Sequence, residues 1–197
     1  RFASALRKAG VHRGDRVAFL LHDGVTLAAG FWGALAAGAV AVPLNTLLKP
    51  HDHRKILADC DARLVILDPH IAARDVAPAD ALVWTEAEAD SLVAAADPIA
   101  DYAPTHRDGF AFFLYSSGTT GEPKAIPWTQ TTPIKCATDA HFHQNVQPGD
   151  VLVWPTNLGW MMGPWLIFAS LMNRATMGLY SGAPTGRGFG EFVSAAK

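Results

Sequence analysis

Cysteine is scarce in this chain: 197 residues contain only Cys60 and Cys136. The two are far apart in the sequence and show neither a Cys-x-x-Cys pattern nor a cysteine and histidine spacing typical of zinc sites. A disulfide framework and a structural zinc site are therefore not indicated. The composition fits a reducing compartment.

An excess of one charge is also lacking, because the formal net charge is −2 and the basic residues are scattered. This pattern predicts no nucleic-acid partner and no polybasic membrane patch. An anionic ligand therefore has to be held by a local site.

Two runs without charged residues, 24–48 and 151–173, are each long enough to cross a bilayer. The first is better interpreted as a buried helix closing at Gly38, a short strand and a stop at Pro43. The second is interrupted by Pro155 and Pro164, and no Lys/Arg asymmetry flanks it. We expect no membrane span, although a membrane protein with an accidental loop motif is the competing hypothesis.

Strand-like apolar runs alternate with helix-like segments through the first half of the chain. The runs are 16–21, 39–44, 63–68 and 81–84, and helices are expected near 2–10, after Pro50 and within 86–104. This alternation is typical of an α/β fold with a mostly parallel sheet flanked by helices. The Ala- and Asp-rich connector predicts a boundary between an N-terminal α/β subdomain, 1–104, and the start of a second, 105–197.

The second half opens with the apolar run 109–115, which suits a strand buried on both faces. A helix is predicted from Thr132 and Pro133, as N-cap and first-turn proline. Further strands are expected at 151–154 and 175–180, and further helices at 162–173 and after 186.

The histidine pairs His51/His53 and His141/His143 fall in helical segments. A spacing of two places the members of each pair on opposite sides of a helix, so a shared metal ion is not expected. All four are interpreted as surface residues.

The segment after the strand at 109–115 is rich in hydroxyl groups and glycine, and it ends in Pro-Lys: SSGTTGEPK, residues 116–124. Such a loop offers free backbone N–H groups, and hydroxyls that bind phosphate or magnesium, while Lys124 adds a positive charge. The spacing differs from the Walker pattern GxxxxGK[ST]. A phosphate-binding loop and a solvated Ser/Gly turn both remain open on composition alone.

The run YSSGTTGEPK, residues 115–124, resembles the signature loop of the adenylate-forming superfamily, which comprises acyl-CoA synthetases, adenylation domains and luciferases. The segments GVHRGDRVAFLL and AGAVAVPLN are similar to the family's N-terminal subdomain, and VWPTNLGWMMGPW takes the place of its second aromatic motif. The resemblance covers essentially the whole chain. Within the superfamily the chain most resembles acetyl-CoA-synthetase-like acyl-activating enzymes, including plant peroxisomal members.

The resemblance implies an AMP-forming acyl-CoA ligase whose ligands are ATP, Mg²⁺, coenzyme A and a small-molecule carboxylic acid. It assigns residues 116–121 to the β- and γ-phosphates, the Thr119 hydroxyl to magnesium, and Lys124 to phosphate charge or to clamping the loop. The implied loop residues are Ser116, Ser117, Gly118, Thr119, Thr120, Gly121, Glu122, Pro123 and Lys124. The implied location is the cytoplasm, with the peroxisome as the alternative.

Trp160 falls where the family places an aromatic residue at the edge of the acyl pocket, with Met161 and Met162 beside it. The resemblance therefore implies that these three residues bind the acid. Ordinary core packing is the alternative, because an aromatic residue and two methionines beside an apolar helix are common core residues.

Two departures from the family pattern qualify these expectations. Ala125 stands where the family has a glycine after the lysine. The family's Tyr-Gly-x-Thr-Glu segment, with its magnesium-binding glutamate, and the catalytic lysine of its C-terminal domain are not found in residues 1–197. We therefore expect an N-terminal fragment of the large domain that is inactive alone. A non-catalytic nucleotide-binding or interaction remnant is the alternative.

Overall fold

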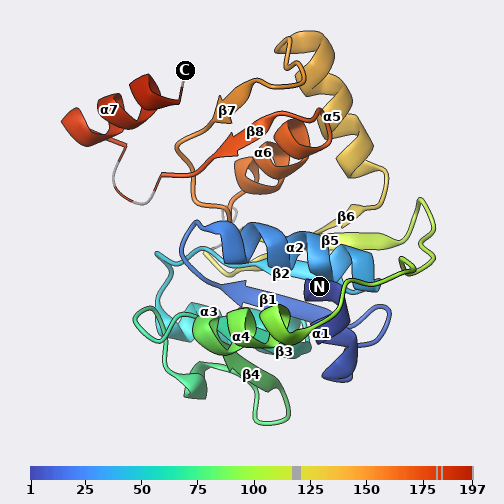
Figure 1. Ribbon diagram of the computed structural model, residues 1–197. Coiled ribbons are helices and arrows are strands. Elements are labelled where there is room, and N and C mark those ends of the chain that lie inside the picture. Colours follow the sequence, from blue (N-terminus) through green and yellow to red (C-terminus); the bar gives the residue numbers. More distant parts are fainter. Residues whose placement is uncertain (117–120, 181, 183, 197) are drawn as a thin grey trace.

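The computed structural model describes residues 1–116, 121–180, 182 and 184–196, and its framework is a six-stranded and a two-stranded sheet (Figure 1). The strands are β1 (Arg16–Leu20), β2 (Val40–Pro43), β3 (Ala62–Leu67), β4 (Leu82–Thr85), β5 (Phe110–Ser116), β6 (Lys124–Thr129), β7 (Val151–Val153) and β8 (Thr176–Gly178). The helices are α1 (Phe2–Lys8), α2 (Val25–Ala37), α3 (Pro50–Asp59), α4 (Glu86–Ala95), α5 (Thr132–His143), α6 (Met162–Leu171) and α7 (Arg187–Ala195), with a 3-10 helix, η1 (Arg74–Val76).

The large sheet has the strand order β4-β3-β1-β2-β5-β6, and all its neighbouring pairs are parallel except β5 and β6. The predicted α/β class with a mostly parallel sheet is therefore confirmed. No strand was predicted from the sequence at β6, which pairs antiparallel with β5 at the end of this strand order. An edge position explains how this strand accommodates Pro127, which has no N–H for a ladder hydrogen bond.

Side chains alternate between the two faces of the large sheet, and each face has its own core. Val17 and Phe19 of β1 belong to the cluster that contains buried residues of α1, α2 and α4. Ala18 and Leu20 belong to the cluster on the opposite face, which also contains Ile56 and Leu57 of α3. The period of two in strands and the apolar faces of the helices account for this two-sided packing.

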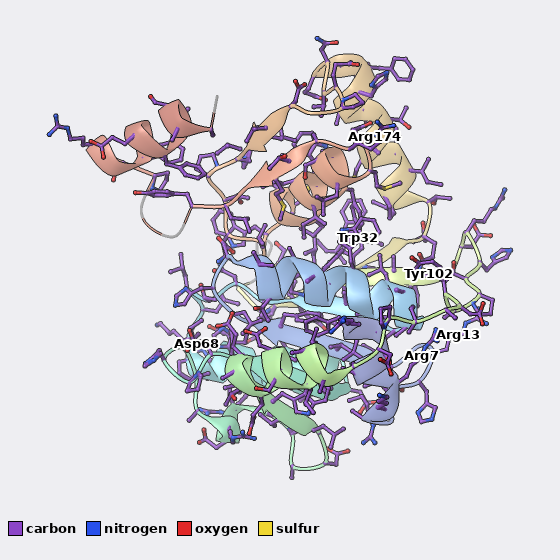
Figure 2. The ribbon with its side chains drawn as sticks, viewed as in Figure 1. Arg7, Arg13, Trp32, Asp68, Tyr102 and Arg174 are labelled. Atoms are coloured by element: carbon purple, nitrogen blue, oxygen red, sulfur yellow. The ribbon has the colours of Figure 1, made fainter. Side chains whose placement is uncertain are left out.

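The smaller sheet and helices α5 and α6 form a layer that packs on α2 (Figure 1). The buried Phe168 ring of α6 lies 5.5 Å from the Phe31 ring and 5.3 Å from the Trp32 ring of α2, measured between centroids. Figure 2 shows Trp32 between α2 and this layer. These aromatic contacts extend the core that contains Val17 and Phe19 from the large sheet to the layer of the small sheet. The same core includes Leu158, in the segment before α6, and Phe112 of β5.

The two uncharged runs are divided between short elements, α2 and β2 in the first and β7 and α6 in the second. As predicted, α2 ends at Gly38. Within the described residues, no helix has the length and apolar character needed to cross a bilayer. The boundary at residue 104 stays a prediction, and the six-stranded sheet contains strands from both sides of it.

Two local predictions were wrong. His53 is not a surface residue: its side chain is almost fully buried, and its Nε2 lies 2.9 Å from the carbonyl oxygen of Asn45. It shares a helix face with Ile56 and Leu57, three and four residues on, so this face turns it into the core. The second correction concerns α5, whose N-cap is Thr131 rather than Thr132; the helix simply begins one residue earlier than the pattern suggested.

Candidate functional site

A cavity of about 530 Å³ lies at the carboxyl ends of β2 and β5. In α/β sheets, ligand sites form at this edge, because the loops that follow parallel strands meet there. Its lining residues come from the β2–α3 connection and α3, from β5 and β6 with the ends of the loop between them, and from the turn before α6. They are Asn45, Leu48, Asp52, Ile56, Leu114, Tyr115, Ser116, Gly121, Pro123, Ile126, Trp128, Trp160 and Met161.

The predicted phosphate-loop residues are only partly described. Ser116 ends β5 and, with Gly121 and Pro123, lines the cavity. The predictions for Ser117, Gly118, Thr119 and Thr120, including the magnesium site at Thr119, lie outside the described residues. The described ends of the predicted loop therefore both line this cavity.

Glu122 and Lys124, at the end of the loop, do not line the cavity. Lys124 begins β6 and is exposed, and in the described part of the chain its ammonium group forms no ion pair. Glu122 accepts hydrogen bonds from Nζ of Lys55 on α3, at 3.0 Å to Oε1 and 2.8 Å to Oε2. Sequence reasoning did not find Lys55, because it lies 67 residues away from Glu122.

Trp160 and Met161 line the cavity together with side chains of α3 and are 56% and 59% exposed. Met162 begins α6, is half-buried, and is not a lining residue. Of the three residues expected to bind the acid, the structure thus brings Trp160 and Met161 together with the loop ends. Their exposure leaves both side chains available to a ligand.

The turn that carries Trp160 is tied to the loops after β1 and β2. Asp23 accepts a hydrogen bond from the Leu158 N–H at 2.8 Å, and the side-chain amide of Asn157 donates to Thr46 Oγ1 at 3.2 Å. Burial raises the pKa of Asp23, and the Leu158 N–H partly offsets this effect. These contacts join segments more than 100 residues apart, so they set the position of Trp160 against the sheet.

Tyr115 fixes the start of the loop. Its hydroxyl donates a hydrogen bond of 2.6 Å to Oδ2 of Asp59 on α3. Burial and this carboxylate both raise the pKa of Tyr115, so the side chain stays a neutral phenol whose O–H donates to the carboxylate. Residue 116, the first of the predicted phosphate loop, follows directly from this fixed point.

The cavity residues of the β2–α3 connection and α3 were missed by sequence reasoning. Asn45 and Leu48 follow β2, and Asp52 and Ile56 lie on α3. The available signal was the parallel sheet itself, since the carboxyl ends of neighbouring strands share one edge. This signal locates the cavity residues only when β2 and β5 are known to be neighbours, and about 70 residues separate these two strands in sequence.

Other reactive groups give no competing site among the described residues. Burial raises the pKa of the Cys60 thiol to about 12, which leaves it protonated and unsuited to nucleophilic attack. No group of three or more His, Cys, Asp or Glu side chains in the described ranges is placed to hold a metal ion. The cavity beside the loop is therefore the site with the clearest chemistry.

Residues 1–195 match the AMP-binding enzyme family. The chain belongs to this family. It is 66% identical over 84 residues to probable acyl-activating enzyme 17, peroxisomal, of Arabidopsis thaliana, a match that spans 43% of the chain and 12% of that protein. It is 33% identical over 183 residues to the 3-hydroxybenzoate–CoA/4-hydroxybenzoate–CoA ligase of Thauera aromatica, covering 83% of the chain and 34% of the ligase.

A solved structure of a benzoate CoA ligase from Burkholderia xenovorans LB400 has the same fold over 98% of the chain, with a TM-score of 0.84 and 32% sequence identity. The chain covers 40% of that ligase. It thus spans well under half the length of each of these relatives. The expected resemblance to acyl-activating enzymes is confirmed, and the fold agrees with that of a CoA ligase.

Proposed function

We propose that residues 1–197 are the phosphate-loop part of an AMP-forming acyl-CoA ligase. The enzyme joins a carboxylic acid to the α-phosphate of ATP, forming acyl-adenylate, and then passes the acyl group to the thiol of coenzyme A. The single observation that carries this proposal is the shared cavity: Ser116 and Gly121 at the loop ends line the same space as Trp160. Bound phosphate and a bound acid can meet only if their sites share a space.

In the first step an oxygen of the carboxylate bonds to the α-phosphorus, and the bond from that phosphorus to pyrophosphate breaks. Both reactants are anionic, so the main barrier is electrostatic. The chain supplies backbone N–H groups at 116–121 and the exposed ammonium group of Lys124 for the phosphates. In the second step the thiol releases its proton to solvent and its sulfur bonds to the acyl carbon, while the bond from that carbon to the phosphate oxygen breaks and AMP leaves.

Magnesium and coenzyme A complete the proposed ligand set. Mg²⁺ usually keeps several waters and binds through substrate phosphates with one or two protein oxygens, so one hydroxyl is a sufficient contribution from this segment. Thr119 is the residue we propose for it. When bound, the ion neutralises phosphate charge.

The cavity wall favours an acid with an apolar body. Leu48, Ile56, Leu114 and Ile126 line it together with the Trp128 and Trp160 rings. Apolar walls with a few polar groups are typical of small-molecule sites. We propose a small carboxylic acid of this kind as the substrate and the cytoplasm as the location. The name of the Arabidopsis relative keeps the peroxisome as the alternative.

Replacing Trp160 with alanine is expected to change acid preference in a longer enzyme that contains residues 1–197. Removal of the ring enlarges the cavity, and one methylene in a hydrophobic pocket is worth roughly 1–3 kcal/mol, so relative kcat/KM between homologous acids should shift about tenfold or more. Since the side chain is 56% exposed, little stability should be lost. The measurement is kcat/KM across a series of homologous acids, with the urea unfolding midpoint.

The KM for ATP is the internal control for this substitution, because Trp160 lies outside the predicted phosphate loop, 116–124. A uniform loss of activity on all acids, accompanied by strong destabilisation, would retire the acyl-pocket role of Trp160. Tyr102→Ala, which removes another exposed aromatic ring well away from the cavity, serves as the matched variant and should leave acid preference unchanged.

The binding of polyphosphate to residues 1–197 tests the proposed function directly. With Mg²⁺ present, pyrophosphate or ATP should bind weakly, with a Kd in the millimolar range or poorer, because the N–H groups and hydroxyls involved are local to 116–121. Amide NMR shifts should be largest at Gly118 to Gly121. Lys124→Ala should reduce them, whereas Lys8→Ala, which removes an exposed lysine of α1, should not. Shifts spread evenly over the surface, and unchanged by Lys124→Ala, would instead indicate a solvated turn.

A further inference from the structure

One face of α3 contacts both ends of the predicted phosphate loop. Lys55 and Asp59 are four residues apart on this helix and therefore lie on the same side. Asp59 accepts the hydrogen bond of Tyr115, just before the loop, and Lys55 binds both carboxylate oxygens of Glu122, near its end. A single helix thus determines where the chain enters and where it leaves the loop.

The contacts of Tyr115 with Asp59 and of Lys55 with Glu122 differ in their exposure to solvent. The Tyr115 hydroxyl is part of a half-buried side chain and bonds to its acceptor at 2.6 Å. The ion pair between Lys55 and Glu122 is open to solvent, with side chains 53% and 66% exposed. Exposed ion pairs are weak and exchange readily with water. The Glu122 end of the loop is therefore held by a contact that can open.

The charge of Glu122 matters for the ligand of the loop. Its carboxylate lies one residue after Gly121 and two before Lys124, in the segment that has to accept a polyphosphate. An unpaired carboxylate there repels the ligand, and a second acid, Asp52, lines the neighbouring cavity wall. In the structure the Lys55 ammonium, 2.8 Å away, compensates this negative charge and draws it toward α3.

We propose that Lys55 is a positioning residue for polyphosphate binding, which acts by holding the Glu122 carboxylate on α3 and away from the ligand. This role rests on the proposed function, since it presumes that the loop binds phosphate. The ligand class is a nucleoside triphosphate or pyrophosphate. Lys55 itself need not touch the ligand.

The test is a pyrophosphate titration of residues 1–197 with Mg²⁺, followed by amide NMR. Lys55→Met should weaken binding about three- to tenfold, the scale of one uncompensated charge a few ångströms away in a solvated site. Glu122→Gln should bind at least as tightly as the wild type. The double variant Lys55→Met/Glu122→Gln should return to within about twofold of the wild-type Kd, because no carboxylate remains to be held.

Arg54→Met is the matched control, since Arg54 is the neighbouring exposed cation on α3 and forms no ion pair within the described residues. Equal weakening by Arg54→Met and Lys55→Met would reduce the effect to general surface charge and overturn the role of Lys55. Failure of the double variant to recover the wild-type Kd would also overturn the role of Lys55. An ion pair that only stabilises the fold is lost in Lys55→Met and in the double variant alike, so both would then bind equally weakly. Absence of pyrophosphate binding in the wild type would overturn the proposed function together with this role, so the two failures are distinguishable.

Discussion

Replacing Gly159 with alanine is expected to destabilise the chain by about 1–3 kcal/mol, the usual cost of forcing an added carbon into a filled space. A Cβ at this position would lie 2.3 Å from the carbonyl carbon of Leu44 and 2.4 Å from the backbone nitrogen of Asn45. Both atoms belong to the backbone that leaves β2, so no side-chain rotation can relieve the contact. Urea unfolding of residues 1–197 measures the change in the free energy of unfolding.

The same substitution should affect acid selection in the longer enzyme, because Gly159 directly precedes Trp160 and lies in the turn anchored by Asp23 and Thr46. Displacing this turn moves the ring that lines the cavity. Gly190→Ala is the matched control: among the described residues, nothing lies within 4 Å of a Cβ at that helical position, so alanine should stabilise α7 by about 0.5–1 kcal/mol. Equal stability changes in the two variants would contradict the close packing of Gly159 on β2.

Much of the fold could be predicted because local patterns and tertiary packing agree in this chain. The apolar run 16–21 became β1, buried on both faces, and Pro50 begins α3 with Ile56 and Leu57 turned inward, as predicted. Gly38 ends α2 where the pattern placed it. In each case the signal and the structure depend on residues within one helical turn or one strand.

The features that were missed depend on contacts between distant segments. The antiparallel pairing of β6 is decided by its neighbour β5 and not by its own proline-containing sequence. His53 was predicted to lie at the surface from its spacing to His51, although its position on α3 turns it into the core. The pair of Lys55 and Glu122 requires α3 to pack beside the loop, which no local pattern reveals.

The residues of the candidate site also divide into those that could be predicted from local sequence and those that depend on tertiary contacts. The loop could be predicted from its own residues and from the resemblance they carry, since phosphate binding needs a compact set of N–H groups and hydroxyls. The cavity residues that follow β2, Asn45, Leu48 and Asp52, could be placed beside the loop only from the strand order β1-β2-β5. Residue types alone therefore indicated phosphate binding by the loop, whereas the strand order was needed to find the residues that line the cavity beside it.

Residues 1–197 alone are expected to form no acyl-adenylate. Lys124 is the one phosphate-binding cation that we assign to this segment, and the resemblance places the family's magnesium-binding glutamate and its C-terminal catalytic lysine outside residues 1–197. Removing a single preorganised electrostatic group commonly lowers kcat by about 10²–10³, and the resemblance implies that both groups lie outside this segment. We expect exchange activity only from a longer protein that contains this segment.

Acid-dependent ATP–pyrophosphate exchange tests the central claim most directly, because it reports formation of the acyl-adenylate itself. It should be measured on the longer protein and on residues 1–197, with short, medium and aryl carboxylic acids. The account predicts exchange by the longer protein with at least one acid, a loss of about 10²-fold or more in its Lys124→Ala variant, and none by residues 1–197. Robust exchange by residues 1–197, or no exchange by the longer protein with any acid, would contradict it.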